Sequence, residues 1–203
     1  MAKLHFKYGA MNSGKSTALI NTAYNYSERG LAVAIIKPEI DTKGENTIVA
    51  RAGLSREVDI LASREMDIRE EVGLYIARRA LDPLHCVLVD ESQFLEPEQV
   101  DQLFEVAKLD DISVIAYGLR TDFRTKLFRG SMRLLELADN IEKLPTMCRC
   151  GSQAEFNCRS INGSFVFDGQ QVAIDGEDET SYDSLCGVCY TDEREKAEKI
   201  QQH

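Results

Sequence analysis

The chain has 203 residues, 43% of them hydrophobic, and a formal net charge of −10. This length allows one sizeable domain and a small one. The acidic balance argues against nucleic acid or an anionic membrane surface as a partner, because both favour a basic face. No apolar run reaches the roughly 18 residues of a membrane span, and the first residues lack a signal-peptide pattern. We therefore expect a cytoplasmic protein, whose six cysteines are thiols or metal ligands rather than disulfides.

The first predicted strand leads directly into a glycine-rich motif. Leu4, Phe6 and Tyr8 alternate with polar residues, and residues 16–28 contain no Gly or Pro, which predicts a strand and then a helix. Between them the phosphate-loop pattern G-x-x-x-x-G-K-[ST] is complete. Its backbone N–H groups hold phosphate oxygens, its lysine reaches the β- and γ-phosphates, and its hydroxyl ligates Mg²⁺. The predicted nucleotide-binding residues are Gly9, Ala10, Met11, Asn12, Ser13, Gly14, Lys15, Ser16 and Thr17.

Apolar strands and helical segments alternate after this loop. Strands are predicted at residues 32–36, 86–89, 112–117 and 141–144. Helices are predicted at residues 67–81, 97–107 and 131–138. The polar stretch over residues 39–56 shows no clear periodicity, and we expect a flexible loop there. This alternation predicts an α/β fold of the P-loop (RecA-like) type, a parallel sheet with helices on both faces.

Two acidic residues follow the predicted strand over residues 86–89. Asp90 stands at the strand end, where a phosphate loop needs a carboxylate that holds Mg²⁺ together with Ser16. Glu91 comes next and can accept a proton from an attacking oxygen. We expect Gln93 and Phe94 to face the same cleft, because ligands bind at the carboxyl ends of strands in such sheets. The alternative is that Glu91 is a solvated loop residue.

The character of the sequence changes at Pro145. We predict a P-loop domain over residues 1–144, a small domain over 145–191 and a helical tail over 192–203, in which Asp192 and Glu195 have the spacing of a capping box. The small domain holds two cysteine pairs separated by 35 residues, a spacing that predicts a tetrahedral structural zinc site. The predicted ligands are Cys148, Cys150, Cys186 and Cys189.

Two further cysteines stand outside these pairs. Cys86 begins a buried strand and is interpreted as a packed thiol. Cys158 could replace one of the four ligands, but its distance from the first pair disfavours this. Because the cysteine pairs lie outside the predicted sheet, we expect loss of the metal to disable the small domain and to spare the phosphate loop.

Four segments together resemble the type II thymidine kinase family, most closely its bacterial members. They are residues 9–17, 89–94 and 117–124 and the paired cysteines around Tyr182. The resemblance implies transfer of the γ-phosphate of Mg-ATP to the 5′-hydroxyl of thymidine, with Glu91 as the catalytic base and with Asp90 and Gln93 at the ATP site. It also implies that a segment tied by zinc, residues 162–182, closes over the nucleoside. We call this segment the lasso.

The resemblance carries further expectations about the substrate and the assembly. It implies a thymidine pocket formed by Met11, Phe94, Leu119, Phe123, Phe128 and Tyr182 and by lasso residues Ala173, Ile174 and Gly176. It implies a homotetramer with dTTP as a feedback inhibitor. The family commonly has arginine where Lys43 stands, so a phosphate contact there is a weaker expectation. Leu119, Phe123 and Phe128 could instead be ordinary core residues.

Two other functions compete with a nucleoside kinase. A P-loop ATPase with a zinc ribbon that acts on nucleic acid would need a basic small domain, and this one is acidic around residues 175–179. A non-catalytic nucleotide-binding module would lack the base or the magnesium ligand, whereas Glu91 and Asp90 are both present. The sequence therefore favours the kinase.

Overall fold

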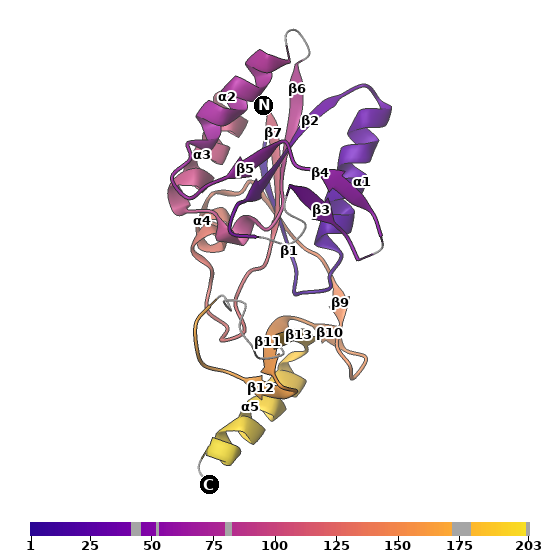
Figure 1. Cartoon of the computed structure of the whole chain (residues 1–203), viewed down its shortest axis with the longest axis vertical. Coiled ribbons are helices and arrows are strands. Elements are labelled where there is room, and N and C mark those ends of the chain that lie inside the picture. Colours follow the sequence, from indigo (N-terminus) through magenta and orange to yellow (C-terminus); the bar gives the residue numbers. More distant parts are fainter. Residues whose placement is uncertain (42–45, 52, 80–82, 172–179, 202–203) are drawn as a thin grey trace.

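The computed structural model describes residues 1–41, 46–51, 53–79, 83–171 and 180–201 (Figure 1). Its centre is a six-stranded sheet in the order β5-β2-β6-β7-β1-β8, and every pairing in it is parallel. The strands are β1 (Leu4–Tyr8), β2 (Ala32–Pro38), β5 (Ile60–Ala62), β6 (Leu84–Val89), β7 (Ser113–Gly118) and β8 (Asn140–Lys143). This confirms the predicted α/β fold.

Helices cover both faces of the sheet, as Figure 1 shows. They are α1 (Lys15–Glu28) on one face and α2 (Ile68–Arg78), α3 (Pro97–Lys108) and α4 (Arg129–Leu137) on the other. Successive residues of a strand point to opposite faces. Thus Val33 and Ile35 of β2 pack with α1, whereas Ala34 and Ile36 pack with the other three helices. Burial on both faces explains why the central strands are almost continuously apolar.

The polar stretch predicted as a loop contains a hairpin, so this prediction was wrong. β3 (Thr47–Val49) pairs antiparallel with β4 (Ser55–Glu57). Ile48 is only 2% exposed and packs into the hydrophobic cluster on the α1 side of the sheet. A strand of three residues with one buried side chain leaves no periodic signal, and packing on α1 stabilises it instead.

A small module follows the sheet and lies below it in Figure 1. It holds the pair β9 (Thr146–Met147) and β10 (Gln153–Ala154) and the antiparallel sheet β12-β11-β13. The strands of that sheet are β11 (Phe156–Ile161), β12 (Ser164–Val166) and β13 (Thr180–Leu185). The last helix, α5 (Gly187–Gln201), follows directly after β13.

The start of α5 corrects the predicted tail. The helix begins at Gly187, so the capping box expected at Asp192 and Glu195 is wrong, and the boundary drawn between residues 191 and 192 falls inside the helix. Tyr190 in its first turn is buried against Phe156 and Phe167, and this packing ties the helix to the small sheet. Within the described part of the chain, none of the helices has the length and apolar content needed to cross a bilayer.

Candidate functional site

The phosphate loop connects the carboxyl end of β1 to the amino end of α1. Gly14 has a left-handed φ of 75°, which glycine adopts without steric cost. A Cβ atom on Gly9 would lie 2.3 Å from Ser13 Oγ and 2.8 Å from Leu144 O, so only glycine fits there. The Lys15 side chain is buried, and its Nζ donates to the carbonyl of Ala10 at 3.1 Å. The loop is therefore held in a tight shape, with its lysine over the backbone that would cradle phosphates.

Ser16 and Asp90 meet beside this loop, as the sequence predicted. Ser16 Oγ donates to Asp90 Oδ2 at 3.2 Å, whereas Asp90 Oδ1 is buried and has no hydrogen-bond partner among the described residues. Burial, followed by the neighbouring charge of Glu91, raises the pKa of Asp90 to about 7. A divalent cation would satisfy the orphan oxygen and favour the ionised carboxylate. Oxygen ligands of this kind suit Mg²⁺, so these two residues fit a magnesium site.

Glu91 occupies an unusual backbone position. Its φ is 47°, in the left-handed region that non-glycine residues seldom adopt. Its carboxylate accepts a hydrogen bond from Gln93 Nε2, and Gln93 Oε1 in turn accepts from the Leu119 N–H at 3.0 Å. Gln93 is only 2% exposed, so both ends of its amide are used within the protein. The structure thus gives Gln93 the position of a side chain that orients Glu91, and its predicted contact with the nucleotide stays a prediction.

The phosphate loop and Glu91 border one cavity of about 180 Å³. The loop contributes Met11, Lys15 and Ser16 to its lining, and Leu119 lines it as well. Nucleophile activation and phosphate binding need to occur within a few ångströms of each other. This cavity brings together the residues predicted for both tasks.

The predicted nucleoside pocket is divided in the structure. Phe94 and Phe128 form an edge-to-face pair with ring centroids 5.7 Å apart, and both line a separate cavity of about 480 Å³. Phe123 is buried beneath the guanidinium of Arg159, which lies 3.8 Å from the ring centroid. Tyr182 is half-buried on β13, opposite Arg159 of β11. Lys43, Ala173, Ile174 and Gly176 lie outside the described residues.

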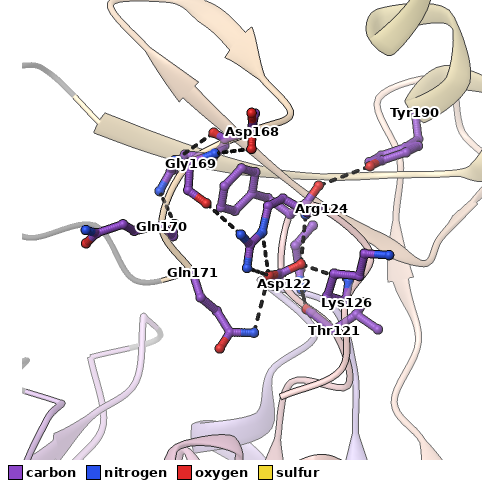
Figure 2. A network of polar contacts seen from close by, with 12 residues as sticks. Thr121, Asp122, Arg124, Lys126, Asp168, Gly169, Gln170, Gln171 and Tyr190 are labelled. Carbon is purple, nitrogen blue, oxygen red and sulfur yellow. Dashed lines mark hydrogen bonds and ion pairs between the residues drawn. The ribbon is translucent and has the colours of Figure 1, made fainter. Parts of the chain in front are cut away.

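A polar network that was not predicted from the sequence holds the first part of the lasso (Figure 2). Arg124 donates from Nε and Nη2 to the buried carboxylate of Asp122, and from Nη1 to the Gly169 carbonyl at 2.7 Å. Gln171 Nε2 donates to Asp122 as well, at 3.3 Å. Arg159 donates to the Gln170 carbonyl at 2.9 Å. These charge-assisted bonds hold residues 169–171 against the loop after β7 and against β11. In the sequence, only the Asp-x-Arg spacing within residues 117–124 points to this network.

The paired cysteines converge on one point. The sulfur atoms of Cys148, Cys150, Cys186 and Cys189 all lie within 4.8 Å of one another. A tetrahedral zinc site with Zn–S bonds of about 2.3 Å has sulfurs roughly 3.8 Å apart, and the Sγ atoms of Cys150 and Cys186 are 3.6 Å apart. The donor set therefore fits a structural zinc ion.

The remaining cysteines play no part in this cluster. Cys158 is buried on β11, and burial raises the pKa of its thiol to about 12. It packs beside Cys148 and Cys186 but is not one of the four cysteines whose sulfur atoms converge, so the alternative of Cys158 as a ligand is wrong. Cys86 is fully buried in the sheet, and burial raises its pKa to about 12 too, which confirms it as a packed thiol. All six cysteines are free of disulfides.

Together these features define a class of protein. A phosphate loop at the carboxyl end of a parallel strand, with a strand-end aspartate bound to its serine, is the nucleoside-triphosphate site of a P-loop protein. A general-base candidate in the same cavity is typical of enzymes that transfer phosphoryl groups.

Comparison with known proteins identifies the family. The sequence model of the family described as "Thymidine kinase" matches residues 2–190. A thymidine kinase of Mannheimia succiniciproducens is 43% identical over 92% of this chain and 93% of its own length. One of Photorhabdus laumondii is 43% identical over 98% and 97%, and one of Enterobacteria phage T4 is 44% identical over 92% and 94%. The chain belongs to the thymidine kinase family.

Proposed function

We propose that this protein transfers the γ-phosphate of ATP to the 5′-hydroxyl of thymidine, which gives dTMP and ADP. The observation that carries the proposal is that Glu91 and the phosphate loop share one cavity. The names of the relatives supply the acceptor. The proposed site residues for ATP are the phosphate loop, residues 9–17, with Asp90 beside it.

Each group in the cavity has a proposed task. Lys15 neutralises charge on the transferred phosphoryl group, and the loop N–H groups orient its oxygens. Ser16 and Asp90 hold Mg²⁺, which shields phosphate charge when it is bound. Glu91, oriented by Gln93, accepts the proton of the 5′-hydroxyl as that oxygen attacks phosphorus. Catalysis of this kind depends on positioning and on charge stabilisation.

The acceptor is tested by comparing nucleosides. By family likeness, we propose that lasso backbone groups bind the imide edge of thymine. We then expect thymidine to be strongly preferred over deoxycytidine, because N3 of cytosine accepts a hydrogen bond where N3 of thymine donates one. A mismatched buried edge costs a few kcal/mol, against roughly 1 kcal/mol for a lost methyl contact. The measurement is nucleoside-dependent ADP release over the common deoxynucleosides and ribonucleosides. Equal efficiency with thymidine and deoxycytidine would contradict the proposed thymidine pocket. If no nucleoside stimulates ADP release, the proposed function is wrong.

The metal site is tested with two cysteine variants of the small module. We expect about one zinc ion per chain, and we expect Cys186→Ser to lose it and to weaken thymidine binding by more than about tenfold, because a structural zinc supplies folding free energy to a module with little core. The matched control is Cys158→Ser, which changes a buried cysteine of the same module outside the cluster. Metal analysis and calorimetric titration give both values. Normal thymidine binding by zinc-free Cys186→Ser would show that the lasso needs no tether.

Assembly and regulation complete the proposal. By family likeness we propose a homotetramer in the cytoplasm that dTTP inhibits as an end product. Reduced cysteines at a metal site suit that compartment. Sedimentation velocity measures the assembly, and thymidine kinase assays with added dTTP measure the inhibition.

A further inference from the structure

The phosphate loop is fastened to the small module through one residue. The Met11 N–H donates to Asn157 Oδ1 at 2.8 Å, and Ser184 Oγ donates to the Met11 carbonyl at 2.5 Å. Asn157 on β11 and Ser184 on β13 are direct cross-strand neighbours. They are 4% and 2% exposed. Two adjacent side chains of the small sheet thus bind both hydrogen-bonding groups of one peptide residue in the loop.

The neighbouring loop residue is held from the same side. Asn12 has a left-handed φ of 65°, and its carbonyl accepts a hydrogen bond from Thr146 Oγ1 at 3.2 Å. A non-glycine residue in this region persists when its surroundings hold it there. Three side chains from beyond residue 144 therefore hold the backbone of Met11 and Asn12.

Asn157 also binds the loop that follows β7. Its Nδ2 donates to the Thr121 carbonyl at 2.9 Å, in the loop that carries Leu119 and Phe123. One buried amide thus joins the phosphate loop to the segment predicted to contact the nucleoside. Since a buried amide is costly to leave unsatisfied, the three segments are held in one arrangement.

We propose that Asn157 and Ser184 are positioning residues for the phosphate loop, through which the small module controls affinity for ATP. Asn157 Oδ1 accepts the Met11 N–H and Ser184 Oγ donates to the Met11 carbonyl, so the pair fixes the orientation of the peptide groups on both sides of Met11. This inference rests on the proposed use of ATP. It goes beyond that function because it makes ATP affinity depend on a module outside the P-loop sheet.

The link to the metal site is short. Ser184 lies two residues before Cys186, and β13 ends at Leu185. The expectation that metal loss would spare the phosphate loop rested on the packing of its strand and helix in the P-loop sheet, and it did not include these two hydrogen bonds from the small module. Metal loss should therefore weaken ATP binding as well as thymidine binding.

The test is equilibrium binding of a non-hydrolysable ATP analogue with magnesium and without nucleoside. We expect Ser184→Ala and Asn157→Ala each to weaken binding by about tenfold, because each leaves one Met11 backbone group unpaired. Ser184→Thr keeps the hydroxyl and is expected to restore binding to within about threefold of the unchanged protein. Thermal unfolding and zinc content of each variant show whether the module is intact.

The matched control is Ser181→Ala. Ser181 also lies on β13 and pairs with Ser160 across the same two strands, with 2.7 Å between their Oγ atoms, so its hydroxyl is bound within the small sheet and not to Met11. This variant should bind the analogue normally. The proposal is overturned if Ser184→Ala also binds normally, or if Ser181→Ala is equally weak. If the protein without substitutions does not bind the ATP analogue, the proposed use of ATP is wrong, which is a different outcome from failure of this proposal.

Discussion

Replacing Lys15 by alanine is expected to lower the turnover of thymidine by more than about a thousandfold. The buried ammonium group lies over the phosphate loop, bound to the Ala10 carbonyl, and among the described residues no other lysine lines this cavity. Phosphoryl transfer develops charge on oxygens that this cation would neutralise. The measurement is ATP-dependent phosphorylation at saturating concentrations of both substrates.

A second lysine provides the control for this prediction. Lys3 is exposed just before β1, so Lys3→Ala removes the same charge from the chain without touching the loop. Its turnover should remain at the level of the unchanged protein. Retention of more than about a tenth of the activity by Lys15→Ala would refute the proposed role of the lysine.

Replacing Glu91 by glutamine is expected to lower turnover by about 10²–10⁴-fold while thymidine and the ATP analogue still bind. The amide keeps the shape of the carboxylate and an oxygen that can accept from Gln93 Nε2, but it cannot accept the 5′-hydroxyl proton. Calorimetric titration measures the two affinities, and a phosphorylation assay measures turnover. This separation of binding from turnover distinguishes a lost base from a distorted site.

The Glu91→Gln variant is compared with a variant of its neighbour, Asp90. We propose that Asp90, which is buried and accepts a hydrogen bond from Ser16, holds the metal, so Asp90→Asn should weaken the effect of magnesium on ATP-analogue binding, which Glu91→Gln should not. If Glu91→Gln keeps full activity, Glu91 is not the base, and Asp90 becomes the candidate.

Features encoded by neighbouring residues could be predicted from the sequence. The phosphate loop depends on glycines that permit backbone turns a few residues apart, and the main strands are nearly continuous apolar runs because both faces are buried. Short strands escaped prediction, since β5 and the β3-β4 hairpin contain only three residues per strand. Packing, rather than local periodicity, stabilises them.

The sequence by itself determined the P-loop class, the acidic pair beside the loop and the four clustered cysteines. Tertiary structure alone decided how these parts are held. It excluded Cys158 from the cysteine cluster and placed Gln93 in a hydrogen bond with Glu91. It also placed Met11 in hydrogen bonds with Asn157 and Ser184. The last two contacts join residues 146 and 173 positions apart in the chain. No local spacing records such pairings, because they exist only once the sheet and the small module have folded against each other.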